Sequence, residues 1–375
     1  MSRLVLPALA GAALLLATVA GSAPAAEPTG DPAFVPPGAT LEKVVDDDRH
    51  DLIFAEGPVV TCDGQVLRSD ITFTTAEKGP HGGLRAGNIM RYDPRTGAVS
   101  VFRSPSGMSN GLRIALTCNL LAAEGADHGG RRITRTDPKT GRAEIVAGLY
   151  QGRPFNAPDD VTIDSKRRIS FSDPRHLGHE PIEQGSMAVY RIDPDGSVHR
   201  IVTDACKPNG VAISPDERTL YVVSNDNGQL DLIRNGASPS TKGVMALLAY
   251  DLDEQGRASN RRAFVDDAPE DGPDGLVVDS EGNLRVAVRN QKQPGIYAYT
   301  PRGEEKAYIP TTGPTSISGA ARTRTSFGSP PTTASIGSGS ARRAITSSNE
   351  ARPRMIGRPG AGRARPTVDR RRGLG

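Results

Sequence analysis

Residues 208–223 read PNGVAISPDERTLYVV, and this stretch decides the fold. A polar residue and a glycine precede a short apolar run, a polar turn follows, and a second apolar run completes the unit. Short runs of β-branched and aromatic residues, separated by a turn rich in Pro and Asp, are typical of two antiparallel strands. The stretch is therefore predicted to form a β-hairpin.

The same unit recurs along the chain. Its copies start at residues 57, 111, 160, 210 and 275, which lie 54, 49, 50 and 65 residues apart. A second unit alternates with it, in which a strand leads to Asp-Pro or a similar pair and then to glycine, as in Tyr92-Asp93-Pro94 to Gly97. Two hairpins in about 50 residues make one four-stranded blade of a β-propeller. The sequence thus predicts an all-β fold with five visible blades, and the pattern stops near Pro314-Thr315, where a sixth blade is expected.

The amino-terminal segment differs from the repeats. Arg3, an apolar run over residues 4–21 and Ser22-Ala23-Pro24-Ala25-Ala26 form the pattern of a secretory signal. Residues 1–26 are therefore predicted to be a cleaved signal peptide, and the mature protein to be periplasmic or secreted. A retained membrane anchor is the alternative, which Pro7 and the small residues disfavour. Residues 27–40, rich in Pro, Gly and Ala, are predicted to form a flexible leader before the propeller domain of residues 41–315.

The carboxyl-terminal tail, residues 316–375, is rich in Ser, Thr, Gly, Arg and Pro. It cannot bury enough apolar surface to fold, so it is predicted to be disordered. From residue 321 onward, 12 Arg against Glu350 and Asp369 give a net charge of +10, whereas residues 1–320 carry −7. A basic arm for anionic surfaces is one explanation of the tail. We favour another, an altered reading frame that removes or scrambles the last blade, and the acidic body excludes the basic surface of a nucleic-acid-binding protein.

A polar residue stands at the head of each predicted innermost strand. These residues are Glu56, Asn110, Asp159-Asp160, Asn209 and Asp274. Because innermost strands surround the central channel of a propeller, the side chains are expected to face one axis. Carboxylate and amide oxygens without thiols suit a hard divalent cation, with Ca²⁺ first and Mg²⁺, Mn²⁺ or Zn²⁺ as competitors. The alternative is that they are turn residues, which Glu56 opposes because Glu has no turn preference.

The motifs, taken in order, resemble those of the gluconolactonase, regucalcin and luciferin-regenerating enzyme family. They are Ala55-Glu56-Gly57-Pro58, Asn156-Ala157-Pro158-Asp159-Asp160, Ser172-Asp173-Pro174, Pro208-Asn209-Gly210-Val211-Ala212 and Pro273-Asp274-Gly275-Leu276. Glu124-Gly125-Ala126 followed by Arg131-Arg132 resembles the exported bacterial gluconolactonase branch. The likeness covers about residues 41–312.

This resemblance implies a six-bladed β-propeller with a divalent cation in its channel. It implies that Glu56, Asn209 and Asp274 are the metal ligands and that Asp274 is also the general base. Asp159 stands at a position that is usually Asn, and with Asn110 and Glu124 it is expected to hold the hydroxyls of a sugar substrate. We therefore expect a metal-dependent hydrolase of gluconolactone-like sugar lactones, with Ca²⁺ as its most suitable ion.

Two competing functions follow from the same residues. One is a propeller that binds calcium or carbohydrate without turnover, and the other is a defective, truncated family member. The expected partner is a small-molecule lactone, with neither nucleic acid nor, after signal cleavage, a membrane.

Three further motifs are treated as structural. His176 and His179 are predicted to be solvent-exposed loop residues, because no second pair of ligands follows them. The segment Ala115-Leu116-Thr117-Cys118 replaces the turn expected in its blade. With Cys62 and Cys206, Cys118 makes an odd number of cysteines, which predicts at least one free or buried thiol.

Overall fold

The computed structural model describes residues 27–311 except 40, 42, 46–49, 74–78, 80 and 231–240. The chain divides into two units, Met1–Ser340 and Ala341–Gly375. All described residues belong to the first unit. The predicted signal peptide (1–26) and tail (316–375) lie outside the described residues.

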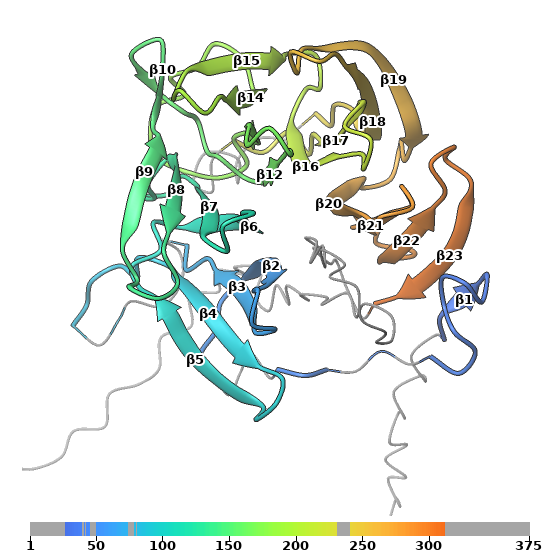
Figure 1. Ribbon diagram of the computed structural model, residues 1–375, viewed down its shortest axis with the longest axis horizontal. Helices are drawn as coiled ribbons and strands as arrows, with labels where there is room; N and C mark the ends of the chain where they lie inside the picture. The colour runs from blue at the N-terminus through green and yellow to red at the C-terminus, as the bar shows by residue number, and fades with distance from the viewer. Residues whose placement is uncertain are drawn as a thin grey trace, which may run out of the picture. The chain divides into compact units, whose positions relative to one another are not determined.

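Every regular element of the described residues is a β-strand, as the repeats predict, and the strands form five sheets of the propeller type (Figure 1). We number these sheets blades 1 to 5. Blade 1 is β2 (Ala55–Val60), β3 (Val66–Asp70), β4 (Asn88–Asp93) and β5 (Ala98–Arg103), and blade 2 is β6 (Ser109–Ile114), β7 (Leu120–Glu124), β8 (Arg132–Thr136) and β9 (Ala143–Ala147). Blade 3 is β12 (Val161–Ile163), β13 (Ile169–Asp173), β14 (Ala188–Ile192) and β15 (Val198–Val202), and blade 4 is β16 (Pro208–Ile213), β17 (Thr219–Asn225), β18 (Met245–Leu252) and β19 (Ala258–Asp266). Blade 5 is β20 (Pro273–Val278), β21 (Leu284–Val288), β22 (Gly295–Tyr299) and β23 (Glu305–Pro310).

Consecutive strands of each blade pair antiparallel, which the hairpin pattern predicts. Two short pairings add to the blades: β1 (Thr29–Gly30) joins the edge of β23, and β10 (Leu149–Tyr150) pairs with β11 (Arg153–Pro154). No helix of the described residues is long and apolar enough to cross a membrane.

The outermost strand of each blade is its most exposed strand. In blade 4, β18 (MALLAYDL) is mostly buried, whereas the outermost strand β19 (ASNRRAFVD) is mostly exposed. A strand that is covered on both faces by neighbouring blades takes apolar residues in succession, whereas an outer strand needs few. The composition of each strand thus sets its place in the blade.

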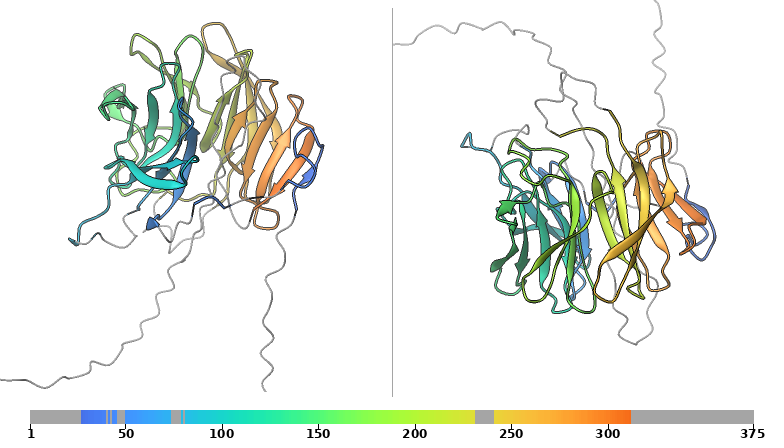
Figure 2. Two further views of the ribbon diagram at one scale, coloured as in Figure 1. Left: turned by 60° about the horizontal axis from the view of Figure 1, so that its bottom comes forward. Right: turned by 90° about the horizontal axis from the view of Figure 1, so that it is seen from above.

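One apolar cluster fills each junction between neighbouring blades, which pack face to face (Figure 2). Strand β7 shows how the alternation works. Leu120 and Ala122 belong to the cluster shared with blade 1, whereas Leu121 and Ala123 belong to the cluster shared with blade 3. Successive side chains of a strand point to opposite faces, so one apolar strand supplies two junctions.

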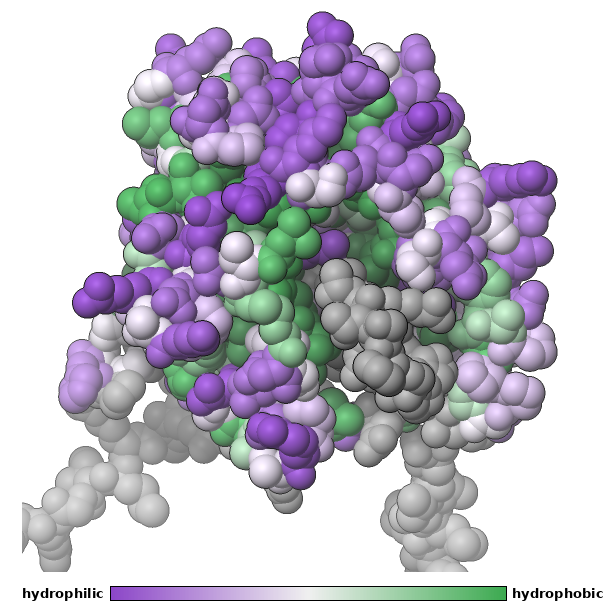
Figure 3. Space-filling model, viewed as in Figure 1, coloured by the Kyte–Doolittle hydropathy of each residue, from purple (hydrophilic) through white to green (hydrophobic). Residues whose placement is uncertain are grey.

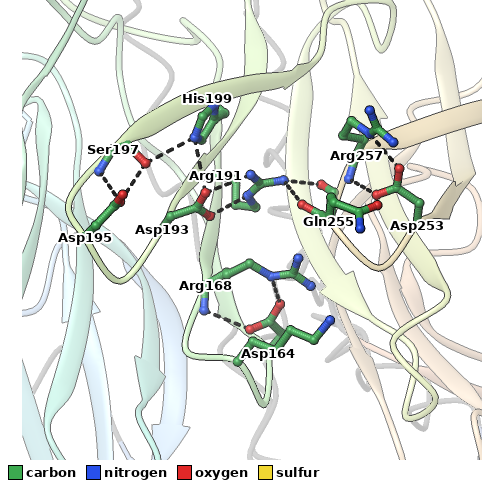
Figure 4. Close-up of polar contacts among 12 residues, drawn as sticks. Asp164, Arg168, Arg191, Asp193, Asp195, Ser197, His199, Asp253, Gln255 and Arg257 are labelled. Carbon is green, nitrogen blue, oxygen red and sulfur yellow. Dashed lines mark hydrogen bonds and ion pairs between the residues drawn. The ribbon is translucent and has the colours of Figure 1, made fainter.

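Polar contacts join blades 3 and 4 at the end of the strands opposite to Asp159-Asp160 (Figure 4). The buried Arg191 of β14 binds Asp193, with Nε 2.7 Å from Oδ1, and also donates to the backbone oxygen of Gln255, 2.7 Å away in the β18–β19 turn. Arg168, bound to Asp164, donates to the same turn. The carbonyl oxygens of a turn often lack backbone hydrogen-bond donors. Here the guanidinium groups of blade 3 donate hydrogen bonds to the carbonyl oxygens of a turn in blade 4.

The face of blade 5 opposite to blade 4 is covered by residues from the amino-terminal segment. Phe34, Val35 and Ala39 pack against apolar residues of β22 and β23, and the guanidinium of Arg285 lies 5.9 Å from the centre of the Phe34 ring. Three side chains of the predicted leader, residues 27–40, thus pack against blade 5, and its flexibility stays a prediction. No described strand lies between β20 of blade 5 and β2 of blade 1, so no described blade covers this face of blade 5 (Figure 1). The apolar side chains of the amino-terminal segment cover it instead.

Candidate functional site

Four of the five inner strands carry a β-bulge at the same place. The pairing register shifts between Glu56 and Val59 in β2, and likewise after Ser109, Pro208 and Pro273 in β6, β16 and β20. A bulge adds a residue to one strand and re-aims the side chains beside it. Asn110, Asn209 and Asp274 lie within these bulges, and Glu56 directly precedes the bulge of β2.

Glycine follows the polar residue because the inner strands approach one another closely. A Cβ on Gly57 would lie 2.2 Å from the backbone oxygen of Asn110 in blade 2, and one on Gly210 would lie 2.7 Å from that of Asp274 in blade 5. In blade 3 the glycine position is Asp160, whose Oδ2 accepts a hydrogen bond of 2.9 Å from the backbone N–H of Val211. These contacts fix the polar residues of neighbouring blades relative to one another.

Three carboxyl groups from blades 1, 3 and 5 come together. Glu56 and Asp274 are buried, with 6% and 3% of their surface exposed, and Asp159 is partly buried. Burial raises the pKa of Asp159 well above its usual range, and the negative charges of Asp274 and Glu56 raise it further. Asn110 donates to Asp159, with 3.0 Å between Nδ2 and Oδ2. We call Glu56, Asp159 and Asp274 the acidic cluster.

Arg289, which directly follows β21, carries a positive charge into the acidic cluster. Its Nη1 lies 3.0 Å from Oδ2 of Asp274. The charge of Asp274, and to a smaller extent that of Glu56, raises the pKa of Arg289 above its usual value. The guanidinium therefore partly balances the buried carboxylates.

Asn209, the polar head of β16, lies beside His176 of the β13–β14 loop. The Asn209 Nδ2 and the His176 Nε2 are 3.4 Å apart. Burial lowers the pKa of His176 to about 3, and the positive charges of Lys207 and Arg289 contribute. The imidazole is therefore neutral at neutral pH and lies within electrostatic reach of Arg289, unlike the solvent-exposed loop residue that the sequence predicts.

Glu124 has different surroundings. It lies on β7, fully buried, and binds Arg103 through Oε1, Thr134 through Oε1 at 2.9 Å and Arg132 through Oε2 at 2.7 Å. Both carboxylate oxygens are thus engaged by side chains of β5 and β8. The predicted contact of Glu124 with substrate stays a prediction, whereas its structural role in the sheet is visible.

The oxygen donors suit a hard cation by their chemistry, since Glu56, Asn209 and Asp274 offer carboxylate and amide groups. As arranged, however, no three His, Cys, Asp or Glu side chains of the described residues are grouped so that they could hold a metal ion. One oxygen of Asp274 is engaged by Arg289. The donor set therefore fits the predicted cation in type but does not form a closed coordination shell.

A concavity lies on blade 2, and Glu56, Asp159 and Asp274 do not line it. It is lined by residues of β8 to β11 and their loops, including Arg131, Ile145, Leu149 and Pro154. Ile145 and Leu149 are 62% and 55% exposed, and hydrophobic residues are visible on this edge as well as toward the middle of the face in Figure 3. None of its lining residues is a titratable member of the predicted site.

Sequence reasoning missed Arg289 and the partial burial of His176. Both lie beyond the second strand of a blade, where the repeat pattern gives no expectation. A signal was present for Arg289, because a charged residue directly follows the apolar run Val286-Ala287-Val288. For His176, the contact with Asn209 joins two blades and has no local signal.

Comparisons with known proteins agree with this architecture. A sequence model described as "SMP-30/Gluconolactonase/LRE-like region" matches residues 54–325. A gluconolactonase from Zymomonas mobilis is 31% identical over 242 residues, which are 58% of this chain and 62% of that protein. A pentonolactonase from Haloferax volcanii is 27% identical over 54% of this chain and 59% of that protein. The chain thus spans less than two thirds of the length of these relatives.

Solved structures give the same result. A gluconolactonase from Xanthomonas campestris has a TM-score of 0.56 and 27% identity, covering 71% of this chain and 78% of that one. Regucalcin from Agrobacterium tumefaciens, described as a calcium-binding protein, has a TM-score of 0.52 and 20% identity over 71% and 77% of the two chains. At that identity the second likeness concerns the fold alone.

Proposed function

The chain belongs to the SMP-30/gluconolactonase/LRE-like family, and from this premise we propose that it is a lactonase that opens sugar lactones. The observation that carries the proposal is the acidic cluster, in which carboxyl groups of blades 1, 3 and 5 meet beside the amide of Asn110. The likeness to the gluconolactonase of Zymomonas mobilis supports the substrate class.

The proposed mechanism includes a divalent cation, Ca²⁺ first, with Glu56, Asn209 and Asp274 as the residues that would hold it. When bound, such an ion polarises a carbonyl group and stabilises the negative charge of the tetrahedral intermediate. Asp274 acts as general base and accepts a proton at a carboxylate oxygen from the water that attacks the lactone carbon. Asn110 and Asp159 orient the substrate through its hydroxyls, and Glu124 is proposed to help them. The bond from the carbonyl carbon to the ring oxygen then breaks, and the protonated Asp274 gives its proton to that oxygen.

We also propose that the fold is of the six-bladed type, with a last blade that is absent or scrambled. Five blades are described, and blades 1 and 5 each have a face without a described neighbouring blade. Export through the signal sequence of residues 1–26 is part of the same proposal. Resequencing the DNA across codon 314 tests the reading-frame explanation, and an unaltered frame with no sixth blade encoded in another frame would reject it.

The competing proposal is a propeller that binds a cation or a carbohydrate without turnover. The ion pair between Arg289 and Asp274 is the observation that favours it, because it engages the proposed base. Turnover distinguishes the two proposals.

The test is hydrolysis of glucono-1,5-lactone by the chain from Glu27 onward, with and without a chelator. We expect turnover that the chelator abolishes, that one divalent ion restores and that Asp274→Ala lacks. Asp253→Ala, which removes a carboxylate from the β18–β19 turn, serves as the control and should retain turnover. A soluble, folded protein that binds the ion but leaves the lactone intact would replace the lactonase with the binding protein.

A further inference from the structure

The ion pair of Arg289 and Asp274 joins a buried group to a more exposed one. The side chain of Asp274 is 5% exposed, whereas that of Arg289 is 36% exposed. The guanidinium thus reaches the acidic cluster from the solvent side, beyond the end of β21. It can leave without unpacking the strand that carries it, because its exposed part already lies in water.

Blade 4 shows what this position does elsewhere. Asn225 in blade 4 is equivalent to Arg289 in blade 5. Ser224 pairs with Pro208, the first residue of β16, and Asn225 directly follows Ser224. In the same way Val288 pairs with Pro273, the first residue of β20, and Arg289 directly follows Val288. Asn225 donates to the backbone oxygen of Pro273 in the next blade, at 2.8 Å. No blade is described beyond blade 5, and Arg289 binds Asp274 of its own blade instead. In blade 4 the residue at this position thus binds the next blade, whereas in blade 5 it binds the acidic cluster.

A cation and the guanidinium would need the same carboxylate. An oxygen that accepts a hydrogen bond from Arg289 cannot at the same time coordinate an ion along that direction, and two positive charges this close repel one another. The other charges that act on the guanidinium are those of Glu56, Asp159 and Asp271, which attract it. Lys207 and Arg289 both act on His176, which is neutral at neutral pH. The negative charges of the acidic residues hold the guanidinium in place until a bound cation neutralises those charges.

We propose that Arg289 is an internal counter-ion that competes with the divalent cation for Asp274 and so lowers the cation affinity of the site. This inference rests on the proposed cation dependence. Arg289 is a positioning residue here, since it acts through Asp274. Cation binding displaces its guanidinium toward the solvent, and the loss of the ion returns it to the carboxylate.

The test is calorimetric titration of the full chain with Ca²⁺, comparing wild type with Arg289→Gln, Arg289→Lys and Arg285→Gln. Arg285 is the matched control, because it lies on β21, the strand that Arg289 directly follows, and forms an ion pair of the same 3.0 Å length with Asp279, outside the acidic cluster. We expect Arg289→Gln to bind Ca²⁺ roughly tenfold or more tightly, since one repulsive charge is gone. Arg289→Lys, which keeps the charge, and Arg285→Gln should bind as wild type does.

The melting temperature gives a second measurement and controls for folding. Without an ion, Arg289→Gln should melt at a lower temperature than wild type, because Asp274 loses its partner, and saturating Ca²⁺ should raise its melting temperature more than that of wild type. Equal or weaker Ca²⁺ binding by Arg289→Gln overturns the inference alone, provided that wild type still needs the ion for lactone hydrolysis. Absence of Ca²⁺, Mg²⁺, Mn²⁺ and Zn²⁺ binding in both proteins overturns the inference together with the cation dependence.

Discussion

Gly57 shows at the scale of one residue how backbone packing places the polar heads. Its φ is +50°, and a Cβ would lie 2.2 Å from the backbone oxygen of Asn110. We expect Gly57→Ala to lower the free energy of unfolding by about 3 kcal/mol, through left-handed strain plus this clash. Gly64→Ala is the control, because Gly64 also has a positive φ but nothing within 4 Å of a Cβ, so it should cost roughly 1 kcal/mol. Equal losses in urea denaturation would show that the approach of blades 1 and 2 is loose.

Asp267 offers a pH test away from the acidic cluster. Burial raises its pKa to about 6, and the charge of Asp266 adds to the shift. Because the folded state then binds more protons than the unfolded state between about pH 4 and pH 6, the free energy of unfolding falls as pH rises through this window. We expect Asp267→Asn to stabilise the protein by about 1–2 kcal/mol at pH 8, a value reduced for its partial exposure, and to have little effect near pH 3.5. Urea denaturation at both pH values measures this, and an equal gain at both would exclude titration as the cause.

At the scale of elements, the hairpins were predictable because turn residues and apolar runs are local signals. The polar heads were predictable for the same reason, since each comes shortly before the apolar run of its strand. The contacts of Glu124 were not, because Arg103 and Arg132 belong to other strands, and only the sheet brings them to its two carboxylate oxygens. A carboxylate in a recognisable motif can therefore be either a substrate contact or a structural ion-pair partner, and only its neighbours in the fold distinguish the two roles.

Glu124→Gln separates these two roles. The variant leaves two guanidinium groups facing a neutral amide in a buried place, so we expect it to lower the free energy of unfolding by about 3 kcal/mol. Chemical denaturation measures this loss, with Glu144→Gln on the exposed strand β9 as the control. Unchanged stability together with a raised KM for the lactone would instead identify Glu124 as a substrate contact.

At the scale of the whole molecule, contacts between distant segments limit what sequence can predict. The pairing of β1 with β23 joins residues near opposite ends of the described chain, and Thr29-Gly30 carries no strand signal of its own. The disulfide between Cys62 and Cys118 is a second case. The Ala115–Cys118 segment, which departs from the expected turn, is the β6–β7 turn that carries this bond. The odd cysteine count did predict a free thiol, which is Cys206.

The disulfide fastens an end of the described set of blades. Blade 1 shares an apolar cluster with blade 2 but has no described blade on its other side, so Cys62–Cys118 links the β2–β3 turn of blade 1 to its single described neighbour. The bond closes a separation of 56 residues, and we expect its removal in Cys62→Ser/Cys118→Ser to cost about 2–4 kcal/mol. Hydrogen exchange should then show blade 1 opening before blades 3 and 4. Cys206→Ser is the control and should leave both measurements unchanged. If exchange rates rose equally in all blades, the five blades would unfold as one cooperative unit and the disulfide would act on the unfolded chain alone.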